Sequence, residues 1–162
     1  MKYEFVEIEK KAQEIIEDCF SEFPLPIVSI VNMLGFDVVE AIIFDPSIRG
    51  FIEHNKITVS SGISAVEKRV CIAQALGLYH FKYDGKSLEK EEVSILPEAI
   101  FKSSSEIDKI AYRFAAALLI PKDRLISKLK EFRGCPMDLM AENFAVPKRL
   151  LSFRMQQGVK IK

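Results

Sequence analysis

The side chains that could bind a metal ion or act as a nucleophile are few in this chain of 162 residues. There are two histidines, His54 and His80, and three cysteines, Cys19, Cys71 and Cys135, with no C-x-x-C pair among them. A catalytic zinc ion takes three protein ligands and a water molecule, and a base must lie close enough to accept the proton of that water. The first question is therefore whether any helix or strand gathers such a set.

The stretch RVCIAQALGLYHF, residues 69–81, has the spacing of a zinc-binding helix without its ligands. Such a helix reads H-E-x-x-H, with two imidazoles one turn apart and a carboxylate beside the first. In the same frame this chain has Gln74, Ala75 and Leu78. A neutral amide suits harder ions than zinc, and neither alanine nor leucine can coordinate a metal or transfer a proton. The frame therefore predicts no catalytic residue, no metal ligand and no cofactor.

The remaining histidines and cysteines are not spaced to take over this role. His80 follows Leu78 by two residues, about 200° round the helix, so we expect it to point away from the frame and to be partly exposed. His54 falls in a predicted turn, where a histidine is solvated. Cys71 lies one turn before Gln74 without further ligands beside it, and a buried free cysteine behaves as a small apolar side chain.

The elements that position these residues predict an α+β fold. Helical periodicity predicts helices over 4–21, 27–34, 65–82, 106–119, 122–132, 137–145 and 148–158. Runs of β-branched and aromatic residues predict an antiparallel meander of three strands, at 36–44, 49–54 and 56–60. The segment 93–101 contains Pro97, which predicts an edge strand or an extended loop. Ser64 and Ser105 are predicted caps of the helices 65–82 and 106–119.

The motifs, in this order, resemble those of the ImmA/IrrE family of metallopeptidase-like proteins. Residues 69–79 resemble the family's R-F-T-x-A-H-E-L-G-H-Y, and residues 110–121 resemble its E-A-N-x-F-A-A-x-L-L-M-P. The other matching segments are Leu34-Gly35, Gly50-Phe51, residues 57–60 and residues 139–150. The resemblance covers most of the chain, and it implies a zincin-like core with a small antiparallel sheet packed on helices.

The resemblance also implies a zinc endopeptidase site at four positions, none of which carries the family's residue. The first zinc histidine falls on Gln74, the general-base glutamate on Ala75, the second histidine on Leu78, and the third ligand, a glutamate, on Ile110. We call these four the site positions. If Ile110 faces Gln74 and Leu78, the metal cavity becomes a small apolar core. Replacing buried ionic groups by packed apolar ones is often neutral or stabilising.

The resemblance therefore implies a catalytically inactive pseudo-peptidase that binds a protein partner. A helix-turn-helix repressor of a phage or another mobile element is one such partner, because active members of the family resemble repressor-cleaving switches. Binding by strand addition would use a sheet edge, and the expected edges are 56–60, with Ile57 and Val59, and 93–101. A zinc metallopeptidase with residual or relocated activity is an alternative.

The charge of the chain is balanced overall but uneven along its length. There are 23 basic and 23 acidic residues, yet from residue 122 onward ten are basic and four are acidic. This asymmetry suits a second alternative, a DNA-binding regulator in which Lys148, Arg149 and Arg154 contact phosphates. Solvated helix faces explain the same residues. We expect a peptidase-like core, 1–121, and a helical, helix-turn-helix-like C-terminal subdomain, 122–162, in one compact unit.

The sequence also bears on where the protein is found. Its odd number of isolated cysteines indicates a reducing compartment. No apolar run approaches the ~18–20 residues that a membrane-spanning helix needs, and the N-terminal sequence is too charged for a signal peptide. We therefore expect a cytoplasmic protein without a membrane partner.

Overall fold

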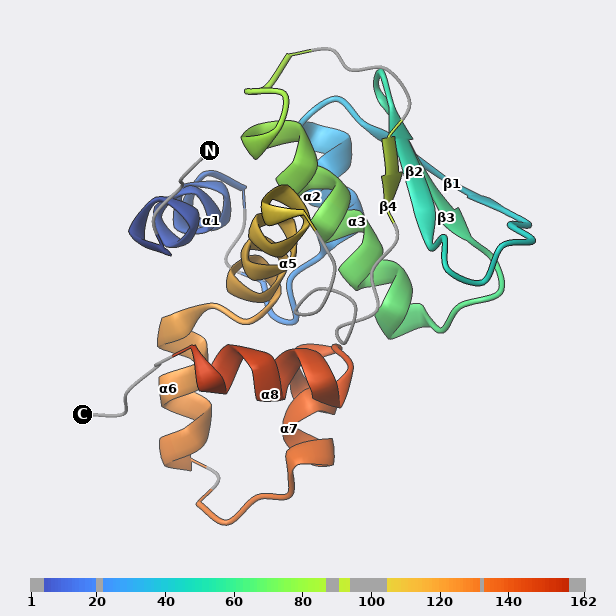
Figure 1. Cartoon of the computed structure of the whole chain (residues 1–162). Helices are drawn as coiled ribbons and strands as arrows, with labels where there is room; N and C mark the ends of the chain where they lie inside the picture. The colour runs from blue at the N-terminus through green and yellow to red at the C-terminus, as the bar shows by residue number, and fades with distance from the viewer. Residues whose placement is uncertain (1–4, 20–21, 87–90, 94–104, 132, 158–162) are drawn as a thin grey trace.

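The computed structural model describes residues 5–19, 22–86, 91–93, 105–131 and 133–157 (Figure 1). Its helices are α1 (Phe5–Cys19), α2 (Ile27–Met33), α3 (Ala65–Phe81), α5 (Glu106–Leu119), α6 (Lys122–Glu131), α7 (Met137–Phe144) and α8 (Lys148–Gln156). Its strands are β1 (Asp37–Ala41), β2 (Gly50–Glu53), β3 (Lys56–Ser60) and β4 (Glu91–Val93). The chain is an α+β protein, and each predicted helix is present. None of the helices within these ranges is long and apolar enough to cross a membrane.

The two predicted serine caps begin the central helices of the fold. Ser64 Oγ accepts a hydrogen bond of 3.3 Å from the N–H of Glu67 at the start of α3, and Ser105 Oγ accepts one of 3.3 Å from Asp108 at the start of α5. Each cap satisfies a backbone N–H that has no partner inside its helix. From residue 70 to 78 every residue of α3 is buried. Figure 1 accordingly shows α3 between the sheet and α5.

The sheet has the strand order β1-β3-β2-β4. β2 pairs with both β3 and β4 in antiparallel fashion, whereas β1 pairs with β3 in parallel, with Asp37 opposite Lys56. The predicted antiparallel meander is therefore wrong for β1. The alternation of side chains identifies a strand but not its neighbour. Here residues 42–49 carry the chain from the end of β1 past β3 to the start of β2.

The predicted edge at residues 56–60 is also wrong, because β3 lies between β1 and β2. Its residues Ile57 and Val59 are buried, with 0% and 1% of their surface exposed. Among the strands in the described ranges, β1 and β4 are the edges of the sheet. Of the other predicted edge, 93–101, Val93 ends β4, and residues 94–101 lie outside the described ranges.

Two glycines allow α3 to pack closely against its neighbours. A Cβ on Gly50 would lie 2.4 Å from the carbonyl oxygen of Thr58 and 2.7 Å from the sulfur of Cys71, so β2 rests directly on α3. A Cβ on Gly77 would lie 3.0 Å from the Cα of Ala111, so the backbone of α5 also lies close to α3. A Cβ on Gly50 would clash with β3 and α3, whereas one on Gly77 would require α5 to move by a few tenths of an ångström.

The C-terminal helices are joined to the rest of the protein by arginine contacts. Arg154 of α8 is fully buried, and its Nε donates a hydrogen bond of 3.0 Å to the carbonyl of Ile120 after α5. Its guanidinium also forms an ion pair with Glu9 of α1. Arg69 of α3 donates a hydrogen bond of 2.9 Å to the carbonyl of Ala145, between α7 and α8. These contacts therefore connect the predicted core, residues 1–121, with the predicted C-terminal subdomain, residues 122–162.

Candidate functional site

The four site positions lie inside the protein, on the two helices that pack most closely. Gln74, Ala75 and Leu78 belong to α3 and Ile110 belongs to α5, and none is more than 3% exposed. Gln74 and Leu78 are one helical turn apart, so they lie on the same face of α3. Together these residues offer one amide and three apolar side chains.

The contact between Gly77 and α5 relates the α3 positions to Ile110. The Cβ built on Gly77 would meet the Cα of Ala111 at 3.0 Å and the ring of Phe114 at 3.1 Å. Leu78 directly follows Gly77, and Ile110 directly precedes Ala111. The segment of α5 that carries Ile110 is therefore pressed against the segment of α3 that carries Leu78.

Gln74 is the polar residue among the site positions, and its amide is not satisfied. Its Nε2 is buried and has no hydrogen-bond partner among the described residues. An unpaired buried amide group costs about 1–3 kcal/mol of stability. A neutral amide cannot act as a general base, and the residues that the structure describes contain no group of three His, Cys, Asp or Glu side chains close enough to hold a metal ion.

Cys71, one turn before Gln74, does not supply a nucleophile. Burial raises the pKa of its thiol to about 12, and Glu67 raises it further while Arg49 lowers it. The thiol is therefore protonated at neutral pH, whereas the thiolate is the form that attacks substrates and binds metals. Its sulfur faces the backbone of Gly50 in β2, so Cys71 fills space between helix and sheet.

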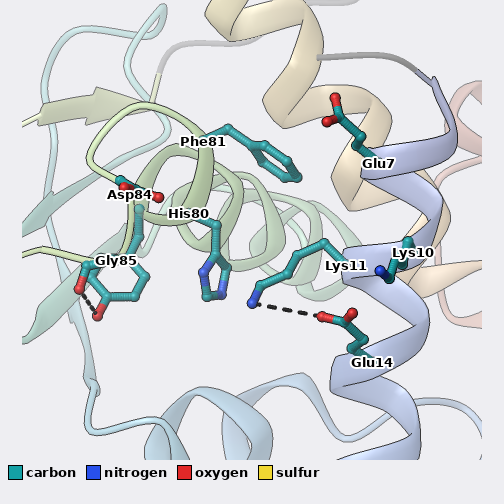
Figure 2. A pocket seen from close by; sticks show the side chains of 9 residues that line it. Glu7, Lys10, Lys11, Glu14, His80, Phe81, Asp84 and Gly85 are labelled. Atoms are coloured by element: carbon teal, nitrogen blue, oxygen red, sulfur yellow. Dashed lines mark hydrogen bonds and ion pairs between the residues drawn. The ribbon is translucent and has the colours of Figure 1, made fainter.

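A surface pocket of about 440 Å³ lies between α1 and the C-terminal end of α3. Figure 2 shows His80 and Phe81 on one side and the charged side chains of α1 on the other, with Lys11 held by Glu14 at 4.0 Å. The lining residues are Glu7, Lys10, Lys11, Glu14, Tyr79, His80, Phe81, Asp84 and Gly85. The pocket carries both signs of charge and is separate from the site positions.

His80 is half-buried and lines this pocket, so it is partly exposed, as predicted. Burial lowers the pKa of His80 to about 4, and Lys11 contributes to the same shift. Its Nε2 has no hydrogen-bond partner in the part of the chain that the structure describes. The other histidine, His54, is exposed in the turn between β2 and β3, also as predicted.

The three predicted phosphate contacts differ in their exposure and in their partners. Lys148 is exposed and lies 3.4 Å from the carboxylate of Asp138, and Arg149 forms an ion pair with Glu67. Arg154 is fully buried, so its prediction as a nucleic-acid contact is wrong. The physical reason is that its guanidinium is engaged by the carbonyl of Ile120 and by Glu9.

A helical-periodicity signal could have found the burial of Arg154. Leu150 and Leu151 are four and three residues before it in α8, and both are buried. Residues at these spacings share one helix face. An arginine on the apolar face of a helix is therefore expected to be buried together with a charged or hydrogen-bonding partner.

Comparison with known proteins identifies a similar fold but no family. No family model matches the chain, and no curated protein matches it. The structure is similar to that of a Mycobacterium tuberculosis transcriptional regulator, with a TM-score of 0.67 and 16% sequence identity. The match covers 93% of this chain and 46% of the regulator, so this chain spans less than half of that protein's length.

Proposed function

We propose that the chain is a catalytically inactive, zincin-like protein of the ImmA/IrrE type that acts by binding another protein. The observation that carries this proposal is the burial of Gln74, Ala75, Leu78 and Ile110 where α3 and α5 pack together. Three of these side chains are apolar and none can take up a proton at neutral pH. A peptidase reaction at these positions would need three metal ligands and a base.

Binding is the function that such a scaffold retains when the chemistry is removed. A peptidase-like fold recognises an extended polypeptide segment, and this recognition does not require the catalytic groups. The similar fold in a protein described as a transcriptional regulator supports a regulatory setting. A repressor as the partner is what the resemblance to the ImmA/IrrE family implies.

The two alternatives have less support. Relocated peptidase activity would need a ligand set, and the described residues offer none. A DNA-binding role for α8 would need exposed basic side chains, and of the three predicted contacts Lys148 is exposed, Arg149 is paired with Glu67 and Arg154 is buried.

The first experiment restores the four missing residues. The variant Gln74→His/Ala75→Glu/Leu78→His/Ile110→Glu is expected to bind one zinc ion per chain, because the site positions then present two imidazoles and a carboxylate. The untagged wild-type protein is expected to contain no stoichiometric zinc. The measurement is elemental analysis of protein refolded with zinc and then dialysed.

A matched control separates metal binding from the effect of burying polar groups. The variant Gln74→Asn/Ala75→Gln/Leu78→Asn/Ile110→Gln adds polar side chains without good zinc ligands and is expected to bind no zinc. If the fourfold variants do not fold, the variant Gln74→His/Leu78→His tests the helix face alone through weaker zinc binding. Stoichiometric zinc in the wild-type protein, or none in a folded restored variant, contradicts the proposal.

A second experiment tests whether the protein binds a partner without cleaving it. Tagged protein captured from the native host is expected to retain a repressor-like protein at its full length. A cleaved partner, identified by its mass, would instead indicate peptidase activity.

A further inference from the structure

β1 is an open edge of the sheet. It pairs with β3 on one side, and no described segment pairs with its other side. Figure 1 shows it at the side of the sheet away from β4. Natural edge strands are usually protected by lysine, proline, bulges or a covering segment. The sequence DVVEAIIF of residues 37–44 contains no lysine, arginine or proline.

The hydrogen bonds between β1 and β3 show which backbone groups remain open. The N–H of Asp37 donates to Asn55 at 2.8 Å, and the carbonyl of Ala41 accepts from Ser61 at 2.9 Å. In a trans peptide the carbonyl and the following N–H point in opposite directions, so the N–H of Ile42 points away from β3. By the same alternation, the N–H groups of Val38 and Glu40 point away from β3.

Apolar side chains lie along the same edge. Val39 is 41% exposed, Ile42 is 75% exposed and Phe44 is 94% exposed. The turn that follows is fixed by Asp45, whose carboxylate accepts hydrogen bonds from the backbone N–H and the hydroxyl of Ser47. Exposed apolar residues next to unpaired strand groups are typical of a docking surface rather than of a solvated strand.

The charge of the edge indicates what would cover it. Residues 37–48 include Asp37, Glu40 and Asp45 but no lysine or arginine. Of these acids, Glu40 forms an ion pair of 2.9 Å with Lys68 of α3, yet it stays 56% exposed. A segment that carries basic side chains therefore complements this edge.

We propose that β1 and residues 42–44 bind an extended segment of a partner protein that carries a lysine or arginine opposite Glu40 and, two residues away on the same face, an apolar residue opposite Ile42. The segment adds a strand to the sheet, with main-chain bonds to Val38, Glu40 and Ile42 and apolar contacts to Ile42 and Phe44. This docking surface lies at the edge of the sheet opposite β4 and does not depend on the state of the site positions.

The test uses the full chain and a short labelled peptide in which lysine and valine occupy successive positions of one strand face and threonine occupies the other face. The peptide is expected to bind, and the matched peptide with glutamate in place of lysine is not. Residue-resolved hydrogen exchange of the complex is expected to slow at the N–H groups of Val38, Glu40 and Ile42. The N–H of Asp37 serves as an internal control, because it is already bonded to β3.

Two variants locate the binding. Ile42→Lys/Phe44→Lys changes exposed side chains and is expected to weaken peptide binding at least about tenfold, while Leu139→Lys, at an exposed position on α7, leaves it unchanged. Equal binding of both peptides, unchanged binding by Ile42→Lys/Phe44→Lys, or no slowing at the three amides overturns the proposal. A wild-type dimer that Ile42→Lys/Phe44→Lys dissociates would also overturn it, because the occupant would then be a second copy.

Discussion

At the scale of single residues, His80 is a titratable side chain that the fold keeps neutral. Its ring lies between the rings of Tyr79 and Phe114 and faces Lys11 across the pocket. Burial and Lys11 hold its pKa near 4 instead of 6.5. Both effects disfavour the imidazolium, so the folded protein keeps this histidine neutral at physiological pH.

The stability of the protein should therefore depend on His80 as the pH falls. Between pH 6.5 and about 4, the unfolded chain binds a proton at this residue that the folded chain does not bind. Folding stability is lost over that range, by about 1–3 kcal/mol. The variant His80→Phe keeps an aromatic ring and should show a shallower loss. The measurement is urea unfolding of both proteins at pH 7 and at pH 4.5, and equal losses would contradict the pKa shift.

At the scale of elements, the close packing of α3 and α5 determines what surrounds the side chains at the site positions. Gly77 brings the backbone of α5 so near that Leu78 and Ile110 come from segments in contact. Gln74 and Ala75 are buried on the same helix. The side chains at the site positions are therefore packed inside the protein and are not accessible to solvent or to a substrate.

The variant Gly77→Ala tests this packing. In an exposed helix, replacing glycine by alanine adds about 1 kcal/mol of stability. Here the new methyl group would meet α5 at about 3 Å, so we expect a loss of about 1–3 kcal/mol instead. Gly62→Ala is the matched control, because its Cβ would find only an ordinary contact with Ser60. Denaturant unfolding measures both, and a gain for Gly77→Ala would show that α5 can move away.

At the scale of the whole molecule, buried arginine contacts make the C-terminal helices part of the core. Arg154 connects α8 to α5 and α1, and Arg69 connects α3 to the turn between α7 and α8. Glu67 pairs with both Arg49 and Arg149, which adds a contact between α3 and α8. These contacts join residues before and after position 121.

We therefore expect the chain to unfold in one transition, even when one of these contacts is lost. Glu9→Gln leaves the buried guanidinium of Arg154 without its carboxylate, and we expect a loss of about 2–4 kcal/mol. Asp138→Asn removes an exposed pair with Lys148, and its cost should stay under about 1 kcal/mol. Far-UV and near-UV circular dichroism during unfolding give the measurement. A separate transition for the C-terminal helices would indicate two domains instead.

The sequence by itself determined the helices, the α+β class and the absence of ligands in the H-E-x-x-H frame. These are local properties, because caps such as Ser64, helical periodicity and the residue types at Gln74, Ala75 and Leu78 can be read without knowing any distant contact. Only the tertiary structure decided that β1 pairs with β3, that β3 is central, and that Glu9 and Ile120 are the partners of Arg154. Strand neighbours and buried ion pairs join residues far apart in the chain, so local patterns do not contain them.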